Sequence, residues 1–225
     1  MAQTSTFNVQ IDLNALACKR GDRLLFENLS IGLTGGEVLQ VVGPNGSGKS
    51  SLLRILAGLL PPYRGSVTAM FDGEDADEAG YLCHLLSHQD ALKNALSVAD
   101  NLKFWAGFMD SSGLSVDEAL AAVNISHTAH LPAGVLSAGQ RRRFAFARLL
   151  VAHRPIWLLD EPTAALDKAG DTLAGDLISN HVKAGGIAIA ATHLSLRLDL
   201  NAECVKTLDL TDHQPDEPFL DEASL

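Results

Sequence analysis

The glycine-rich segment at residues 43–50 restricts the possible folds of this chain more than any other feature. Its sequence, Gly43-Pro44-Asn45-Gly46-Ser47-Gly48-Lys49-Ser50, matches the pattern G-x-x-x-x-G-K-[ST] in full. The apolar run Val38–Val42 precedes it, and apolar residues at helical spacing follow it from Leu52 to Leu59. A buried strand, a glycine loop and a helix in this order predict a binding site for a phosphate chain.

The residue types in this loop fit phosphate chemistry. Glycines allow successive backbone N-H groups to turn inward around an anion, and the helix N-terminus adds a partial positive charge. We expect Lys49 to contact the β- and γ-phosphates and the hydroxyl of Ser50 to bind Mg²⁺. The predicted nucleotide contacts are Gly43, Pro44, Asn45, Gly46, Ser47, Gly48, Lys49, Ser50 and Ser51.

A pair of carboxylates follows a second strongly apolar run. Residues 156–159 read Ile-Trp-Leu-Leu, and Asp160 and Glu161 come directly after them. Because parallel sheets bind ligands at the carboxyl ends of their strands, Asp160 is predicted to bind Mg²⁺ and Glu161 to polarise an attacking water molecule. An Asp-Glu pair alone is more typical of a solvated turn or a helix start, and the upstream phosphate loop is what favours the catalytic interpretation.

A second glycine-bearing loop, Leu136-Ser137-Ala138-Gly139-Gln140, lies about twenty residues before these carboxylates. Ser137 is predicted to cap a helix that runs from about Gln140 to Val151, with its hydroxyl and the Gly139 N-H facing a γ-phosphate. One site needs only one loop to hold a phosphate chain. A second, distant loop therefore suggests a site that another subunit completes.

Short apolar runs alternate with helical patterns, which predicts a parallel sheet flanked by helices. Further strands are expected at residues 7–13, 65–71, 81–86 and 187–191, with an acidic loop at residues 72–78. A helical subdomain is expected at about residues 90–150, with Ser97 and Ser115 as N-caps and Gly113 as a break. Two glycines, Gly185 and Gly186, are expected to end the helix before the last strand.

Composition limits the function classes. The 225 residues carry a formal net charge of −10, which argues against binding nucleic acid. Six acidic residues and no Lys or Arg occur from Asp209 onward, and residues 211–225 are predicted to form a flexible acidic tail. No leader sequence or apolar run long enough to cross a bilayer is evident, so a cytoplasmic protein without direct membrane insertion is expected. The three separated cysteines fit buried thiols better than disulfides or a metal site.

The order and spacing of these segments resemble the ATPase subunits of ATP-binding cassette (ABC) transporters over residues 7–210. The matching positions are residues 43–50, Gln89, residues 136–140, residues 156–161, Ala165-Leu166-Asp167 and Thr192-His193. The resemblance implies an α/β fold of the P-loop NTPase type, with a parallel-sheet core, a small antiparallel β region and a helical subdomain. It also implies ATP and Mg²⁺ as cofactors.

The same resemblance implies a head-to-tail homodimer. In it, Ser137, Gly139 and Gln140 of one subunit contact ATP that is bound to the phosphate loop of the other. Glu161, His193 and Gln89 would be catalytic, while Ser50, Asp160 and Gln89 would bind the metal. His193 would contact the γ-phosphate, Gln89 would couple the site to a membrane subunit, and Asp167 would link the two sites.

Two positions depart from the family pattern. Ala138 stands where the family usually has glycine, which is tolerable if its φ is negative. Arg20 and Gly21 stand near the place of the aromatic residue that usually stacks on adenine, and the guanidinium plane of Arg20 is a candidate replacement.

A closer resemblance is to the haem-export cassettes of cytochrome c maturation, through residues 52–60, His88-Gln89, residues 101–105 and residues 136–143. It implies a peripheral motor at the cytoplasmic face of the bacterial inner membrane, bound to an integral membrane transporter subunit and to haem-handling maturation proteins. The alternatives are an exporter for lipoprotein release or small molecules, and a soluble cassette protein that acts on ribosomes or DNA. His84 and His88 stand at helical spacing, but a cytoplasmic ATP-driven subunit disfavours a role for them as haem ligands.

Overall fold

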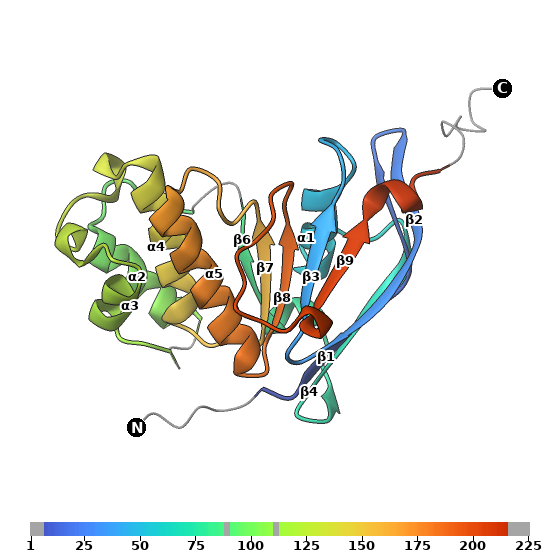
Figure 1. Ribbon diagram of the computed structural model, residues 1–225, viewed down its shortest axis with the longest axis horizontal. Coiled ribbons are helices and arrows are strands. Elements are labelled where there is room, and N and C mark those ends of the chain that lie inside the picture. Colours follow the sequence, from blue (N-terminus) through green and yellow to red (C-terminus); the bar gives the residue numbers. More distant parts are fainter. Residues whose placement is uncertain (1–6, 88–90, 110–112, 216–225) are drawn as a thin grey trace.

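The computed structural model describes residues 7–87, 91–109 and 113–215, and it contains two sheets of different kinds (Figure 1). The parallel sheet has the strand order β6-β7-β8-β3-β9, and the antiparallel sheet has the order β2-β1-β4-β5. The parallel strands are β3 (Val38–Val42), β6 (Cys83–Leu86), β7 (Ile156–Asp160), β8 (Ile187–Ala191) and β9 (Val205–Asp209). The antiparallel strands are β1 (Val9–Arg20), β2 (Arg23–Thr34), β4 (Arg64–Phe71) and β5 (Glu74–Asp75).

Three of the helices gather at one end of the molecule (Figure 1). They lie within residues 90–150, where the sequence predicts a helical subdomain, and α4 packs against α2, α3, α5 and β6. The helices are α1 (Lys49–Leu56), α2 (Val98–Phe108), α3 (Val116–Ala122), α4 (Ala138–Leu150) and α5 (Lys168–Lys183). In the described ranges, no helix is both long and apolar enough to cross a membrane.

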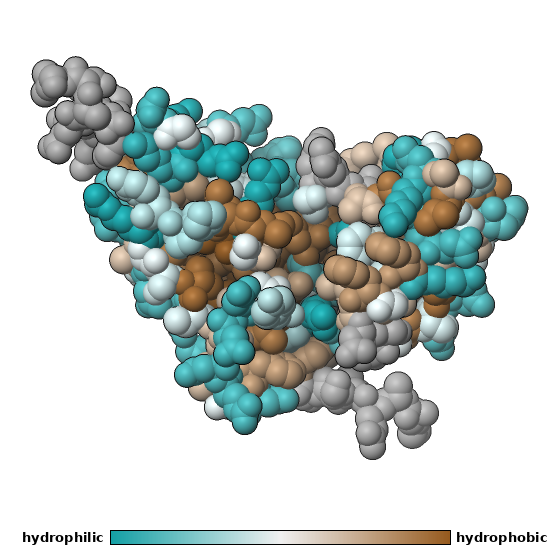
Figure 2. All heavy atoms as spheres, turned by 180° about the vertical axis from the view of Figure 1, so that it is seen from behind, coloured by the Kyte–Doolittle hydropathy of each residue, from teal (hydrophilic) through white to brown (hydrophobic). Residues whose placement is uncertain are grey.

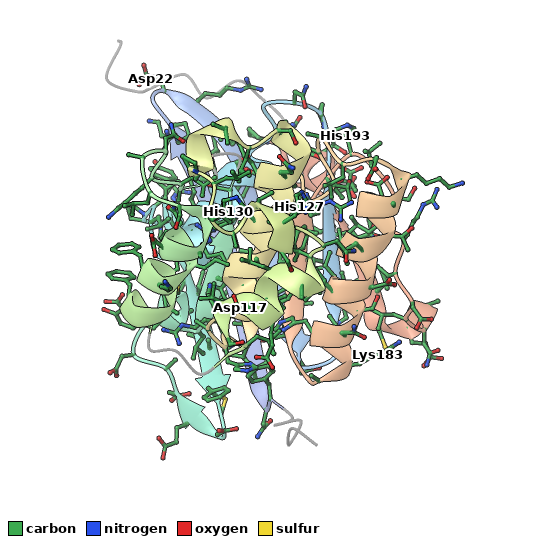
Figure 3. The ribbon with its side chains drawn as sticks, turned by 90° about the vertical axis from the view of Figure 1, so that its left-hand side faces the viewer. Asp22, Asp117, His127, His130, Lys183 and His193 are labelled. Atoms are coloured by element: carbon green, nitrogen blue, oxygen red, sulfur yellow. The ribbon has the colours of Figure 1, made fainter. Side chains whose placement is uncertain are left out.

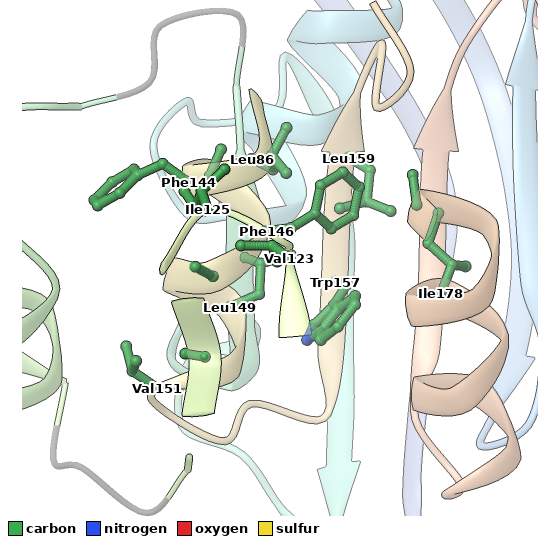
Figure 4. Packing of buried hydrophobic residues seen from close by; sticks show 14 of the residues in the cluster. Leu86, Val123, Ile125, Phe144, Phe146, Leu149, Val151, Trp157, Leu159 and Ile178 are labelled. Carbon is green, nitrogen blue, oxygen red and sulfur yellow. The ribbon is translucent and has the colours of Figure 1, made fainter. Parts of the chain in front are cut away.

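The parallel sheet is buried on both faces, and its central strands β7, β8 and β3 are apolar at every position except Gln40 and Asp160. In β7, Ile156 and Leu158 face a core shared with α1 and the antiparallel sheet. Trp157 and Leu159 face the other core, against residues of α4 and α5 (Figure 4). This two-sided burial explains why the run reads as continuously hydrophobic rather than alternating.

The helix starts follow the predicted caps. The Ser97 side chain accepts a hydrogen bond from the N-H of Asp100 at 3.0 Å. Ser115 forms a capping box with Glu118 at the start of α3. Ser137 caps α4, which begins at Ala138 rather than at about Gln140 as predicted. Ala138 is therefore helical and is not among the residues with positive φ, which is the condition under which a methyl group is tolerated there.

Several predicted boundaries were wrong. The first strand runs to Arg20 instead of ending at residue 13, and β2 and β9 were not predicted at all. In the segment at 81–86 only Cys83–Leu86 is a strand, preceded by a 3-10 turn. A 3-10 turn at Leu210–His213 extends the folded part beyond residue 210. The Asp209 carboxylate accepts a hydrogen bond from the N-H of Thr211 in this turn at 2.9 Å.

Two histidines are buried, one in the parallel sheet and one in a helix that packs against it. His84 lies in β6, and its Nε2 is 2.7 Å from the carbonyl oxygen of Ala152. His181, near the end of α5, stacks on Trp157 with ring centroids 4.0 Å apart. Burial lowers the pKa of His84 to about 4 and that of His181 to about 3. His84 is therefore a packed strand residue and not a helical ligand, and its predicted companion His88 lies outside the described residues.

Because of these two histidines, we expect the free energy of unfolding to fall in mild acid. Their folded pKa values lie below the ordinary 6.5, so the unfolded chain binds protons first and stability falls as pH drops below 6.5. Together, the two histidines are expected to lower the free energy of unfolding by about 3 kcal/mol between pH 6.5 and 5. Urea unfolding at both pH values measures this loss. A His181→Gln variant should lose part of the pH dependence, whereas His127→Gln, at an exposed position, should retain it. An unfolding free energy that is equal at pH 6.5 and 5 would contradict the prediction.

Candidate functional site

The phosphate loop occupies the turn between β3 and α1. Gly43, Gly46 and Gly48 have positive φ values of 138°, 82° and 108°, which side chains disfavour. A Cβ atom at Gly43 would lie 2.9 Å from the Ser47 hydroxyl, and one at Gly48 would lie 3.0 Å from the ring of Phe26. Glycine is therefore required at both positions by backbone conformation and by space.

Two side chains of this loop fit an anionic ligand. Lys49 is buried, and its Nζ donates hydrogen bonds to the carbonyl oxygens of Gly43 at 2.7 Å and Pro44 at 3.1 Å. The ammonium group therefore lies over the loop. Among the described residues, the buried Ser47 hydroxyl has no hydrogen-bond partner. An unpaired buried hydroxyl beside a buried cation fits a site that is completed by a ligand.

The start of α1 packs against the antiparallel sheet. Cys18 of β1 lies beside Ser51 of α1, and burial raises the pKa of the Cys18 thiol. Arg20, two residues further along β1, is exposed and pairs across the hairpin with Arg23. The proposed stacking of Arg20 on adenine remains a prediction.

The carboxylates and His193 meet at the same sheet edge as the loop. The adjacent strands β7, β8 and β3 are parallel, so their carboxyl ends lie together. Asp160 ends β7, and the N-H of Glu161 donates to the carbonyl oxygen of Ala191 at the end of β8 at 2.8 Å. His193 Nδ1 lies 2.9 Å from Glu161 Oε1. Figure 3 shows His193 at the edge of the molecule remote from Lys183, which ends α5.

The signature segment at residues 136–140 lies elsewhere in the chain's own fold. The Ser137 hydroxyl accepts from the N-H of Gln140 at 3.2 Å, and the Gln140 side chain accepts from the N-H of Ser137 at 3.0 Å. A Cβ atom at Gly139 would lie 3.3 Å from the carbonyl oxygen of Ala165, so the segment lies beside residues 165–167. In the part of the chain that is described, no hydrogen bond joins these side chains to the phosphate loop.

Asp167 has a structural partner that the sequence did not reveal. Its carboxylate caps α5 by accepting from the N-H of Gly170 at 2.8 Å, and Arg143 lies 3.4 Å from the same oxygen. The link between two sites through Asp167 stays a prediction. Gln89, predicted to be both catalytic and metal-binding, lies outside the described residues.

Sequence reasoning missed Arg142. Its side chain is 5% exposed, and its Nε donates to the carbonyl oxygen of Pro162 at 3.0 Å. The signal for it is periodicity, because residue 142 shares a helix face with the buried positions 145, 146 and 149. A charged residue on the buried face of a helix needs internal partners.

The comparisons with known proteins agree with this geometry. A family model described as ABC transporter matches residues 26–164. The cytochrome c biogenesis ATP-binding export protein CcmA of Rhizobium johnstonii is 52% identical over 199 residues, which cover 85% of this chain and 92% of that protein. The recognition of the family from the sequence is confirmed.

Solved structures support the same fold. An ABC transporter ATP-binding protein from Pyrococcus furiosus superimposes with a TM-score of 0.75 at 22% identity, covering 92% of this chain and all of that one. A dimeric ATP-binding cassette, solved in a post-hydrolysis state with ADP and Pi, gives a TM-score of 0.72 at 23% identity over 93% of this chain and 99% of that one. The predicted α/β architecture with parallel and antiparallel sheets is confirmed. The chain belongs to the ABC transporter family, and within that family it is a relative of CcmA.

Proposed function

We propose that this chain is the ATP-hydrolysing subunit of an ABC exporter that serves the biogenesis of c-type cytochromes. The observation that carries the proposal is the 52% identity to CcmA over 85% of the chain. An intact phosphate loop and the contact between Glu161 and His193 accompany that identity. The cargo proposed is haem, or a haem complex that ATP hydrolysis resets.

The described residues fit ATP and Mg²⁺. The glycines that exclude side chains, the buried ammonium group of Lys49 and the unpaired Ser47 hydroxyl form a cradle for phosphate oxygens. Ser50 on the first turn of α1 and Asp160 at the end of β7 supply oxygen ligands of the kind that Mg²⁺ prefers. Bound Mg²⁺ would neutralise charge on the β- and γ-phosphates.

Glu161 is proposed to be the general base. Its side chain is only partly exposed and stands at the carboxyl edge of the sheet, where the phosphate loop also begins. A carboxylate at that position accepts a proton from water as the water attacks the γ-phosphate. His193 Nδ1 lies 2.9 Å from Glu161 Oε1. We propose that His193 orients this carboxylate and contacts the γ-phosphate of bound ATP.

The second half of each ATP site is proposed to come from another copy of this chain. Ser137 and Ala138 are exposed and open α4 in the helical region, away from the loop that follows β3. A helix N-terminus with free N-H groups favours the negative charge of a γ-phosphate. In a head-to-tail dimer, Ser137, Gly139 and Gln140 of one copy would cover ATP on the other.

An integral membrane subunit is the proposed further partner, at the cytoplasmic face of the inner membrane. Large apolar side chains are exposed on and beside α1 and α2, including Leu59, Tyr81, Phe104 and Phe108. Apolar surface also gathers in the middle of the face opposite to that of Figure 1 (Figure 2). Exposed apolar surface of this kind is typical of protein contacts, and haem-handling maturation proteins would act with that membrane subunit.

Deletion of the gene tests the proposed cargo. Cells without this chain are expected to lose proteins with covalently bound haem while keeping cytochromes of the b type. Haem staining of denaturing gels and difference spectra of membranes measure the two classes. Normal levels of c-type cytochromes in the deletion strain would contradict the proposal and favour the export of lipoproteins or small molecules.

A further inference from the structure

We propose that Arg142 is a positioning residue that holds the backbone of Glu161 in its catalytic conformation. The inference rests on the proposed role of Glu161 as the general base. It adds that Arg142 is the residue through which helix α4 fixes the backbone of Glu161. Arg142 belongs to α4, which starts at the signature segment, whereas Glu161 follows β7. The two residues are distant in the sequence, and hydrogen bonds connect them in the fold.

The guanidinium group of Arg142 binds consecutive carbonyl groups around the base. Its Nη2 donates to the carbonyl oxygens of Asp160 and Glu161, and its Nε donates to that of Pro162 at 3.0 Å. Its Nη1 donates to the carbonyl oxygen of Ser87 at 3.2 Å, just after β6. The planar fork of arginine, with donors at fixed angles, suits such multiple contacts, which a lysine ammonium group cannot reproduce.

The backbone conformation of Glu161 is unfavourable, so other contacts must stabilise it. Its φ is +47°, a value that residues other than glycine rarely adopt. It also precedes Pro162, and a residue before proline is biased toward an extended conformation. Strained residues persist only where their surroundings fix them, and here three consecutive carbonyl groups are fixed by one buried cation.

Neighbouring arginines on α4 have other partners. Arg148 donates to the carbonyl oxygen of Leu85 at 2.6 Å and lies over the ring of Trp105 at 4.7 Å. Arg143 contacts Val123 and Asp167. Arg148 is therefore a matched control, because it is a buried arginine of the same helix that binds a backbone carbonyl away from Glu161.

The test is a double-mutant cycle on the full-length protein, with single-turnover ATP hydrolysis and ATP affinity measured at an equal folded fraction. Arg142→Gln is expected to lower the hydrolysis rate about 10-fold or more, with ATP affinity changed less than about 3-fold, because geometry and not binding is lost. In the background of Glu161→Gln, Arg142→Gln should change the residual rate less than about 2-fold. Arg148→Gln should lower the melting temperature but leave the hydrolysis rate of the folded protein within about 3-fold of the parent.

Arg142→Lys keeps the charge and tests the same point if Arg142→Gln does not fold. It should give an intermediate rate with Glu161 present and no further loss in the Glu161→Gln background. If the Arg142 and Glu161 effects multiply, Arg142 acts independently of the base and the inference is wrong. If Glu161→Gln itself hydrolyses ATP at the parental rate, the assignment of the base fails, and this inference fails with it.

Discussion

Glu161→Gln is expected to lower the rate of ATP hydrolysis about 100-fold or more while ATP binding persists, because a general base contributes about 10² to 10⁴-fold. Glutamine has nearly the same shape as glutamate but accepts protons poorly. The contact between Glu161 Oε1 and His193 Nδ1 is compatible with an amide oxygen in the same place. The phosphate loop is untouched, so nucleotide affinity should stay within about 3-fold of the parent.

Steady-state hydrolysis and equilibrium binding of ATP separate these two effects. The control is Glu78→Gln, which removes one carboxylate at an exposed position. That variant should hydrolyse ATP within about 2-fold of the parental rate, since surface changes of this kind have small effects. A Glu161→Gln protein with parental turnover would show that another group activates the water.

Lys49→Ala is expected to weaken ATP binding about 10- to 100-fold, because a hydrogen bond to a charged group contributes about 1.5–3 kcal/mol. Lys49 Nζ donates hydrogen bonds to the carbonyl oxygens of Gly43 and Pro44. Its removal therefore takes away both the positive charge and two hydrogen bonds that stabilise the loop. Equilibrium binding of ATP measures the loss. Unlike Glu161→Gln, this variant should fail at binding as well as at turnover.

Lys183→Ala is the matched control for the lost positive charge. Lys183 ends α5, forms an exposed ion pair with Asp199 and lies far from His193 in Figure 3. An exposed ion pair contributes little, so ATP affinity should be unchanged. Parental ATP affinity in Lys49→Ala would contradict the assignment of the phosphate loop.

The parts of the fold that were predicted are those with short-range signals. The Val38–Val42 strand, the glycine loop and the following helix are specified by adjacent residues, and so are the serine caps of α2, α3 and α4. Strand β2 was missed because its alternation is broken, with Asn28 at φ 54° and irregular pairing to β1. Strand β9 was missed because only Leu208 in it is buried.

The site was predicted in its residues but not in its contacts. Glu161 and His193 are 32 positions apart, and their contact depends on β7 and β8 being neighbours in the sheet. The positive φ of Glu161 has no local sequence signal, and helical periodicity predicts that Arg142 is buried but not which carbonyl groups it binds. Such pairings arise from topology and burial, which residue types alone do not specify.

One allele replacement tests most directly whether ATP hydrolysis at Glu161 drives c-type cytochrome biogenesis. The chromosomal copy is replaced by Glu161→Gln, and covalently bound haem is stained in membranes together with an immunoblot of the chain. We predict normal levels of the chain, normal b-type spectra and loss of covalently bound haem. Covalent haem at the parental level in that strain would contradict the proposed role of ATP hydrolysis at Glu161.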